Sequence, residues 1–588
     1  MYLAQLNITN FRKLKKAELN FQKGLNVLVG ANNAGKTAVV DALRALLAGH
    51  DDPFPRLDAE DVHRPKDGSP DGDIVFQYVF RDLGADDEAD FLAALKPSAA
   101  GKMEAHITIR YSEADKTGRL RAKRWCGDHE DVGLTTDMME NLRGVYLPPL
   151  RDASQGLKPG RTSQLSRLFQ LLTDDAGKKG INTALKELDE ALKKHQPVIS
   201  THSAIKGRHG AMLGPQLAQA LELGLIGSDV QRLASRLSLL VDSFDIEQNG
   251  LGFNNLIFMA VVLSELTKNS DASFRSLIIE EPEAHLHPQL QAVLLCYLES
   301  IKAVDGEKPV QLFVTSHSPN FASIAQLDSL ACLVDTGAGV EIFFPRAITF
   351  GKGKREKLER YLDVTRAELF FARRVIFVEG AAELMLVSVL AEKVGYKLRE
   401  HGVSLISVEG LNFDSFLPLF GANALKIPVA IITDADPAAE DEAPQAQYPA
   451  IGDSVQVSAN TAKMKKSEDD FVKVFHGLKT LEYDLALHAD NRVAMLMALK
   501  ELHPKIAETV AAAVEAAQDD AAKARALFSG MFERPQNNVQ KGRFGQTLAQ
   551  VFADGAACAV PDYISNAIVH ACQAGTNAPT ATVAPAEQ

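Results

Sequence analysis

The chain is poor in cysteine and has no long uninterrupted apolar segment. Its 588 residues include only five cysteines, none of them spaced as a CxxC pair, namely Cys126, Cys296, Cys332, Cys558 and Cys572. This argues against a zinc knuckle and against a disulfide framework. Scattered thiols are typical of a reducing cytosol, so we expect a cytoplasmic protein. No apolar run approaches the ~20 residues of a membrane span, and residues 1–14 lack the apolar core of a signal peptide. The sequence therefore predicts no membrane partner.

Positive charge is also scarce. Lys and Arg number 63 against 76 Asp and Glu, which gives a net charge of −13. This balance argues against a protein that coats nucleic acid. It does not exclude a nuclease, because a nuclease needs clustered carboxylates to hold metal and only a local basic track for phosphates. The length predicts three or four folding units.

Hydrophobic patterning predicts an α/β chain of several units. Strand patterns and one helix fill residues 1–155, and amphipathic helices without strands between them fill 156–243. Strand patterns return in 244–364. Strands alternate with helices in 365–574, which is typical of a parallel sheet. The end, 575–588, consists of small and polar residues and contains proline, and we expect a disordered tail.

Two local patterns give sharper predictions. Residues 2–14 alternate apolar and polar side chains and predict one strand. Residues 230–244 have helical periodicity and predict that the helical insertion continues through them.

A phosphate-binding loop is predicted near the N-terminus. Gly30, Asn33, Gly35, Lys36 and Thr37 lie in a GxxxxGK(S/T) motif that follows an apolar strand and opens a helix. The glycines let backbone N–H groups surround phosphates at the helix N-terminus. Lys36 would contact the β- and γ-phosphates of ATP, and Thr37 would bind Mg²⁺.

A second apolar strand ends in two carboxylates, the arrangement called Walker B. Glu280 would complete the Mg²⁺ shell, and Glu281 would polarise the attacking water. His317 follows a third strand, and its imidazole is a candidate partner for phosphate or water. His285 and His287 also suggest a zinc site, but no third ligand lies nearby in the sequence.

The order of these motifs resembles the ABC-type ATPase heads of the SMC and recombination-repair group. In such heads a signature segment precedes Walker B, and Asn249, Gly250 and Gly252 stand at that position here, before a helix expected over 255–268. The resemblance implies that ATP lies between two heads, and therefore a homodimer or higher homo-oligomer. Arg12 resembles the nucleotide-contacting arginine of these heads, although a surface arginine fits its sequence context equally well.

Acidic residues follow two strands farther along the chain. Glu379 and Glu383 flank a glycine turn after one strand, and Asp434 and Asp436 end another. Neighbouring parallel strands end at the same edge of a sheet, so these four carboxylates can converge. Their mutual repulsion would be relieved by divalent cations, and oxygen ligands favour Mg²⁺ or Mn²⁺. Solvated acids in exposed loops are the alternative interpretation.

The VEGxxE segment followed by DxD resembles the Toprim domain. An ATPase head with a helical insertion and a C-terminal Toprim domain resembles the OLD (overcoming lysogenisation defect) family of nucleases, from residue 10 to about 571. The resemblance implies a Rossmann-like Toprim domain with added C-terminal helices. It also implies that Glu482 completes the metal site, that Asp484 assists it, and that Lys541 neutralises charge on the scissile phosphate. Without the resemblance, Lys541 is interpreted as a solvated lysine. The segment 146–152 also looks like a family segment.

A basic stretch precedes the expected Toprim domain. It contains Lys352, Lys354, Arg355, Lys357, Arg360, Arg366, Arg373 and Arg374. These residues could follow a DNA backbone. A soluble linker with ion pairs along a helix explains them equally well.

Taken together, the residues and the resemblance predict an ATP-binding, metal-dependent DNA endonuclease or nickase that acts in phage defence or phage exclusion, with a helicase as a further partner in some relatives. Two alternatives remain open. One is an ATP-gated DNA-binding or repair scaffold with an inactive Toprim domain. The other is a topoisomerase or primase, but no DNA-gate domain with a nucleophilic tyrosine is apparent after the Toprim region.

Overall fold

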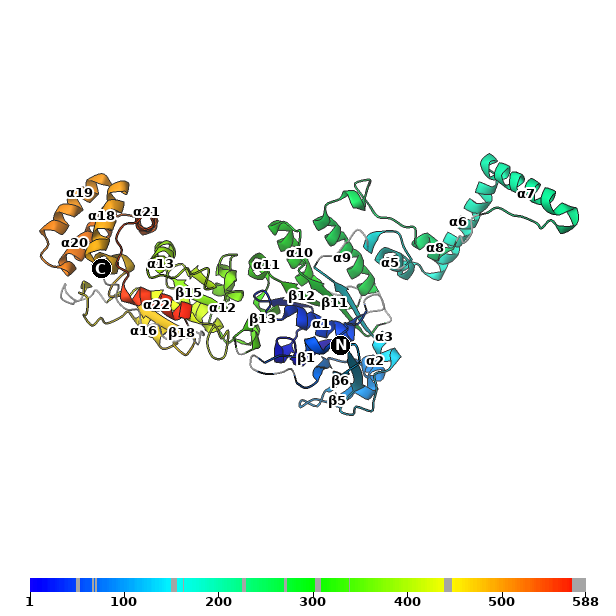
Figure 1. Cartoon of the computed structure of the whole chain (residues 1–588), viewed down its shortest axis with the longest axis horizontal. Helices are drawn as coiled ribbons and strands as arrows, with labels where there is room; N and C mark the ends of the chain where they lie inside the picture. The colour runs from blue at the N-terminus through cyan, green and yellow to red at the C-terminus, as the bar shows by residue number, and fades with distance from the viewer. Residues whose placement is uncertain are drawn as a thin grey trace.

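The structure is a computed structural model, which describes residues 1–48, 53–65, 68, 71–149, 156–161, 163–224, 229–268, 272–301, 308–337, 339–437 and 447–573. Figure 1 shows an elongated arrangement, with an α/β head in the middle, a helical arm at one end, and a second α/β unit with C-terminal helices at the other. The expected tail at 575–588, together with Arg151 and Asp152, lies outside the described residues. Within the described part of the chain, no helix is long and apolar enough to cross a membrane.

The head begins with an antiparallel sheet of order β2-β1-β4-β6-β5, in which β7 also pairs with β6. Its strands are β1 (Tyr2–Phe11), β2 (Leu14–Asn20), β4 (Ile74–Arg81), β5 (Leu95–Pro97), β6 (Met103–Ala114) and β7 (Leu120–Cys126). The prediction of one strand over 2–14 is wrong. The chain turns after Phe11, because Arg12 adopts a left-handed backbone (φ 49°), and β2 then pairs back along β1.

A second sheet of the head has the order β14-β13-β3-β12-β11-β8 and is parallel except for β14. Its strands are β3 (Leu25–Val29), β8 (Leu142–Leu147), β11 (Phe274–Glu280), β12 (Gln311–Ser316), β13 (Leu330–Asp335) and β14 (Val340–Phe343). Because β3, β12 and β11 are parallel neighbours, the segments that follow them meet at one edge.

Helices cover both faces of this parallel sheet. They are α1 (Lys36–Leu47), α9 (Leu251–Lys268), α10 (Pro288–Ser300) and α11 (Pro319–Ile324), with the short α2 (Ala85–Asp90) and α3 (Thr136–Glu140) beside the antiparallel sheet. Successive residues of each strand point to opposite faces of the sheet. Leu28 and Phe313 pack in one core with α1, whereas Val27 and Val314 pack in the other with α9 and α10.

The arm consists of α5 (Gln164–Leu172), α6 (Asp175–Lys193), α7 (Gln196–Leu217) and α8 (Val230–Ala234). Figure 1 shows α6 and α7 projecting from the head, and no residue of α6 is buried. The prediction of a helix through 230–244 is wrong. The chain leaves the helix after α8, and Asp242 and Ser243 both adopt positive φ in a turn between the short strands β9 (Leu240–Val241) and β10 (Phe244–Asp245).

The second α/β unit contains a four-stranded parallel sheet of order β16-β15-β17-β18. Its strands are β15 (Arg374–Val378), β16 (Val403–Ser407), β17 (Val429–Thr433) and β18 (Val472–His476). Its helices are α12 (Lys354–Tyr361), the 3-10 helix η6 (Arg366–Phe370), α13 (Ala381–Lys393), α14 (Phe413–Phe416), α16 (Ala459–Lys465), α17 (Leu481–Ala486), α18 (Ala489–Leu502), α19 (Pro504–Ala516), α20 (Asp520–Phe532), α21 (Lys541–Ala553) and α22 (Asp562–Gln573). The predicted alternation of strands and helices in this region is confirmed.

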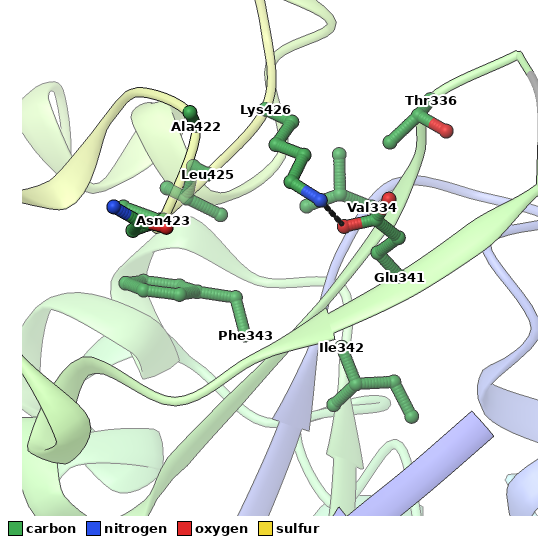
Figure 2. A pocket seen from close by; sticks show the side chains of 10 residues that line it. Val334, Thr336, Glu341, Ile342, Phe343, Ala422, Asn423, Leu425 and Lys426 are labelled. Carbon is green, nitrogen blue, oxygen red and sulfur yellow. Dashed lines mark ion pairs between the residues drawn. The ribbon is translucent and has the colours of Figure 1, made fainter.

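The head and the second unit share a hydrophobic core. Phe343 at the end of β14, Leu358 of α12, Phe370 of η6 and Leu425 belong to one buried cluster that also contains strand residues of both parallel sheets. Figure 2 shows a pocket at this joint, where the ammonium of Lys426 lies 2.7 Å from a carboxylate oxygen of Glu341 on β14. Packing across the joint therefore connects the head directly to the second unit.

Candidate functional site

The predicted phosphate-binding loop lies between β3 and α1. Gly30, Asn33 and Gly35 all adopt positive φ, and a Cβ at Gly30 would collide with the carbonyl oxygen of Leu333. Lys36 is buried, and its Nζ donates hydrogen bonds to the carbonyl oxygens of Gly30 (2.5 Å) and Ala31 (3.0 Å). Burial lowers the pKa of Lys36 to about 8. The loop thus has the backbone conformation and the cation that phosphate binding requires.

A cavity adjoins this loop. Its walls are Arg12, Lys13, Asn33, Gly35, Lys36, Thr37, Ala38 and His317. The structure therefore brings Arg12 and His317 to the predicted phosphate loop. Arg12 is also held by ion pairs with Asp41 and Asp61, at 2.7 Å each. Lys13 was not predicted from the sequence, and its ammonium lies 3.3 Å from a carboxylate oxygen of Asp335.

The Walker B carboxylates lie at the same sheet edge. Glu280 ends β11 and accepts a hydrogen bond from the hydroxyl of Tyr146 (3.3 Å), and burial raises its pKa. Glu281 has a left-handed backbone (φ 45°), and its carboxylate oxygen lies 3.3 Å from Nε2 of His317. Burial, followed by the positive charge of Lys36, lowers the pKa of His317. A neutral imidazole beside Glu281 suits a partner for water or phosphate.

Glu283 is a residue that the sequence analysis missed. One of its carboxylate oxygens accepts hydrogen bonds from the hydroxyl of Ser316 (2.7 Å) and from the backbone N–H of His317 (2.9 Å). Glu283 therefore fixes the segment that carries His317. Of the two histidines near it, His287 caps α10, where its side chain accepts a hydrogen bond from the backbone N–H of Gln289.

The signature-like segment lies apart from the phosphate loop of the same head. Asn249, Gly250 and Gly252 do not line the cavity beside Lys36. The expected helix start at 255 is wrong, because α9 begins at Leu251 and the backbone N–H of Asn254 already donates to the carbonyl oxygen of Gly250 (3.0 Å), while its side chain donates to the carbonyl oxygen of Ile246 (2.8 Å). A Cβ at Gly252 would lie 2.5 Å from the carbonyl oxygen of His285. The segment is thus packed tightly against the loop after Walker B.

The acidic site forms where β15 and β17 end side by side. Glu379 follows β15, and its Oε1 accepts hydrogen bonds from the Thr433 hydroxyl (2.6 Å) and from the backbone N–H of Asp434 (2.8 Å). Asp434 in turn accepts a hydrogen bond from the backbone N–H of Leu481 at the start of α17 (3.1 Å). The structure therefore brings together segments 379, 434 and 481, which are far apart in the sequence.

Glu383 and Glu482 surround the same point. Glu383 lies in the first turn of α13, where its carboxylate accepts a hydrogen bond from the backbone N–H of Gly380 (3.0 Å). Burial and then the negative charge of Glu482 raise the pKa of Glu383. Burial and then Glu379 raise the pKa of Asp434 well above its ordinary value. These carboxylates repel one another strongly enough to perturb their ionisation.

Lys541 supplies a positive charge to this cluster. It begins α21, and its Nζ lies 2.9 Å from Oε2 of Glu482, whose residue is only 1% exposed. Burial opposes the charge of Lys541, but Glu482, followed by Asp434 and Glu383, raises its pKa overall. The lysine thus pairs with the buried carboxylate of Glu482 although its own side chain is 44% exposed, so it is not simply the solvated lysine that its sequence context predicts.

Asp436 and Asp484 occupy different positions from these acids. Asp436 is exposed, with a left-handed backbone (φ 41°), and its N–H points to the carbonyl oxygen of Lys479 (3.3 Å). Asp484 is buried and accepts hydrogen bonds from the backbone N–H groups of Leu478 and Lys479, and burial raises its pKa to about 7. Asp484 therefore holds the loop before α17, whereas the side chain of Asp436 is exposed and no contact between it and the other acids is found in the described residues.

Family comparisons bear on both sites. The family model described as "AAA ATPase domain" matches residues 1–123 and 145–322, more than half of the chain. The family model described as "Overcoming lysogenization defect protein-like, TOPRIM domain" matches residues 370–436. The chain belongs to the AAA ATPase domain family and carries an OLD-like Toprim domain. The predicted order, an ATPase head followed by an OLD-like Toprim domain, is thereby confirmed, as is the enzyme class of an ATPase joined to a Toprim nuclease domain.

Several known proteins resemble this OLD-type chain. The "OLD nuclease" of Thermus scotoductus is 25% identical over 451 residues, which cover 74% of this chain and 82% of that protein. The "Endonuclease GajA" of Bacillus cereus is 26% identical over 38% of this chain and 36% of that protein. The solved C-terminal region of the Burkholderia pseudomallei OLD protein is 26% identical, covers 35% of this chain and 100% of that chain, and has a TM-score of 0.26.

The acidic site of the OLD-type chain fits divalent cations by its chemistry. Oε1 of Glu482 is buried without a hydrogen-bond partner among the described residues. The acidic side chains of the cluster offer a metal ion only carboxylate oxygens as ligands. Uncompensated carboxylates with raised pKa values are stabilised by hard cations, which prefer oxygen ligands. The side chains are nevertheless not arranged as a ligand group, since no three acidic, His or Cys side chains in the described ranges are placed to hold a metal ion.

Three of the eight residues in the basic stretch form ion pairs. Arg366 is buried and pairs with Asp363 and Glu409. Lys354 pairs with Asp414, and Arg355 pairs with Asp328 and Glu359. For these three residues, the contacts favour a structural role over binding to a DNA backbone.

Proposed function

We propose that this OLD-type chain is an ATP-binding, Mg²⁺- or Mn²⁺-dependent DNA endonuclease or nickase. The observation that carries the proposal is the meeting of Glu379, Asp434 and Glu482 at one sheet edge, with Lys541 beside them. Carboxylates from neighbouring parallel strands, together with a lysine, form the donor set that phosphodiester hydrolysis with divalent cations uses. The names of the relatives, an OLD nuclease and an endonuclease, support the same activity.

Each residue has a distinct proposed role. Glu379, Asp434 and Glu482 would bind divalent ions, with Glu383 behind them and Asp436 at the solvent side. Bound ions supply the positive charge that activates a water molecule and stabilises the leaving oxygen. Lys541, released from Glu482, would donate a hydrogen bond to the scissile phosphate and stabilise the charge that develops there.

In the head, we propose that ATP lies against Gly30, Asn33, Gly35 and Lys36, with Mg²⁺ held by Thr37 and Glu280. Glu281 would polarise the attacking water, and the imidazole of His317, 3.3 Å from Glu281, would orient it. Arg12 lines the cavity beside Lys36 and is placed to contact the phosphates. Asn249, Gly250 and Gly252 would contact the γ-phosphate of a partner head, which makes the working form a homodimer or larger homo-oligomer.

We further propose a cytoplasmic protein whose ATPase controls access of DNA to the Toprim site. The biological setting that the family resemblance supports is phage defence or phage exclusion, with or without a helicase partner. The proposed domain limits are 1–155 and 244–364 for the ATPase, 156–243 for the helical dimerisation insertion, and 365–574 for the Toprim domain with its helices.

A second function, an ATP-gated DNA-binding or repair scaffold with an inactive Toprim domain, is favoured by one observation. The ammonium of Lys541 forms an ion pair with the carboxylate of Glu482. It thereby neutralises part of the negative charge that a metal ion would otherwise neutralise. In that case the acids would be structural and DNA would be bound but not cut.

One experiment separates the two functions. Supercoiled plasmid is incubated with Mg²⁺ or Mn²⁺, with and without ATP, beside the Glu379→Ala and Lys36→Ala variants. The nuclease predicts nicked or linear DNA with the wild-type protein, and lost cleavage but retained ATP hydrolysis and DNA binding with Glu379→Ala. The scaffold predicts intact plasmid in every reaction while DNA binding persists. Lys36→Ala tests separately whether bound nucleotide is needed for cleavage.

A further inference from the structure

Arg366 connects the segment before the Toprim sheet to a loop inside it. Its side chain is 9% exposed and makes four hydrogen bonds. Two of them go to the segment before η6, namely from Nη1 to the carbonyl oxygen of Tyr361 (3.1 Å) and to Oδ2 of Asp363 (2.7 Å). The other two go to the loop after β16, from Nε to the carbonyl oxygen of Ser407 (2.9 Å) and from Nη2 to Oε1 of Glu409 (2.5 Å).

The loop that Arg366 holds, residues 407–412, contacts the backbone of Glu379. The N–H of Gly410 donates to the carbonyl oxygen of Glu379 (2.7 Å), and the hydroxyl of Ser407 donates to the same oxygen (3.3 Å). The N–H of Val408 donates to the carbonyl oxygen of Val378 (3.0 Å). Among the described residues, the carbonyl oxygen of Glu379 accepts hydrogen bonds only from the 407–412 loop. This loop therefore fixes the end of β15 on this side.

The 407–412 loop needs support to keep this form. Glu409 has φ 53°, a left-handed conformation that costs a non-glycine residue of order 1 kcal/mol or more. Its side chain is 64% exposed, so an isolated ion pair there would contribute little. The planar guanidinium of Arg366, however, binds the carboxylate of Glu409 and the carbonyl oxygen of Ser407 together, which orients two points of the loop at once.

We propose that Arg366 is a positioning residue for Glu379. It touches neither substrate nor metal, and it acts by keeping the 407–412 loop against the carbonyl oxygen of Glu379, so that the Glu379 carboxylate points at Asp434. The inference rests on the proposed function, because it assigns Arg366 a part in the metal-dependent reaction of the same site. Partners that orient a ligand typically account for about 10- to 100-fold in metal affinity or activity.

The test compares Arg366→Met, Arg366→Lys and Glu409→Gln with wild-type protein. The probe is Mn²⁺ alone, titrated without DNA or nucleotide and followed by electron paramagnetic resonance, with Glu379→Ala defining the Toprim-specific part of the binding. Plasmid cleavage gives kcat and KM separately. Arg399→Met is the matched control, because Arg399 lies in the same Toprim domain but its side chain is exposed and belongs to neither proposed site. ATP hydrolysis by each variant checks that the head is folded.

We expect Arg366→Met to weaken Glu379-dependent Mn²⁺ binding by about 10- to 100-fold, and to lower kcat for cleavage in similar measure, with KM for DNA nearly unchanged. Arg366→Lys should restore part of the loss, because the charge remains but the paired geometry does not. Glu409→Gln should show a smaller loss in the same direction. Arg399→Met should match the wild type.

Two outcomes would overturn the inference. In the first, Arg366→Met hydrolyses ATP normally and binds Mn²⁺ like the wild type. In the second, Arg366→Met does not fold and the exposed variant Glu409→Gln shows wild-type Mn²⁺ affinity and kcat. Failure of the proposed function is distinct from both, since wild-type protein would then show no Mn²⁺ binding that depends on Glu379.

Discussion

The ammonium nitrogen of Lys541 lies 2.9 Å from Oε2 of Glu482, although 59 residues separate the two in the sequence and Glu482 is only 1% exposed. The other oxygen of this carboxylate has no hydrogen-bond partner among the described residues. A buried carboxylate that is half satisfied by a lysine is well suited to exchange that partner for a metal ion. This contact links the resting structure to the proposed chemistry.

Replacing Lys541 by methionine should make the metal-free protein less stable and more responsive to metal. Leaving the Glu482 carboxylate unpaired should cost about 1–3 kcal/mol, a moderate figure because the Lys541 side chain is 44% exposed. In the presence of a chelator, the Tm of the variant should therefore be lower than that of the wild type. Added Mn²⁺ should raise the Tm of the variant by more than it raises the Tm of the wild type. Lys500→Met, at an exposed position of α18, serves as control. Equal Tm values with chelator for Lys541→Met and the wild type would contradict this prediction.

Substituting Gly252 by alanine should disturb the head, whereas the same change at Gly250 should not. A Cβ at Gly252 would lie 2.5 Å from the carbonyl oxygen of His285, and one at Gly250 would meet no atom within 4 Å. Overpacking of this kind typically costs about 1–3 kcal/mol. We expect Gly252→Ala to lower the Tm of the nucleotide-free protein, measured by thermal unfolding, a condition in which the proposed contact of Gly250 with a partner's γ-phosphate plays no part. A Tm of Gly250→Ala that falls as far would indicate that packing against His285 is not the reason.

Nucleotide affinity should fall at alkaline pH. Burial lowers the pKa of Lys36 to about 8, so the free protein loses the Lys36 proton as the pH rises through that value, whereas phosphate binding needs the protonated form. Between pH 7.5 and 9.5 the apparent Kd for ATP should rise, approaching about tenfold per pH unit at the upper end. A Lys36→Arg variant keeps its charge and should show no such rise. The measurement is a calorimetric titration of ATP at several pH values, and a Kd that is constant to pH 9.5 would be incompatible with a buried neutral lysine.

The joint between the head and the Toprim domain should depend on apolar packing far more than on its ion pair. Phe370 is 2% exposed within the core shared by both units, and Phe370→Ala should cost about 3–5 kcal/mol. The Glu341–Lys426 pair in Figure 2 is 49% and 33% exposed, and Glu341→Gln should cost less than about 1 kcal/mol. Calorimetric scans should show both units shifted to lower temperature in Phe370→Ala. A shift confined to one unit would mean that the two unfold independently of the joint.

Local sequence signals predicted the elements that carry both sites. The phosphate loop and the strands before Glu280, Glu379 and Asp434 were predictable, because an apolar strand that ends in glycine or acid has a distinctive pattern. Their convergence follows from the rule that parallel neighbours end at one edge. The turn at Arg12 was not predictable, because the alternation of apolar and polar residues over 2–14 does not indicate that Arg12 adopts a left-handed backbone.

Tertiary contacts account for what the sequence did not reveal. Arg366 was grouped with a basic stretch, but it is buried because Ser407 and Glu409, some forty residues away, supply its partners. Glu283 gave no signal as a support for His317, since their hydrogen bond joins two different strand ends. Lys541 could be assigned only through family resemblance, because its partner lies on another helix.

Acids from three separate segments are proposed to bind divalent ions at one edge of the Toprim sheet. The most direct measurement is anomalous diffraction from crystals of the full chain soaked in Mn²⁺. We predict density for manganese between Glu379, Asp434 and Glu482, with Lys541 moved away from Glu482. Crystals in which no manganese binds there, and in which Lys541 still contacts Glu482 at saturating Mn²⁺, would contradict the account.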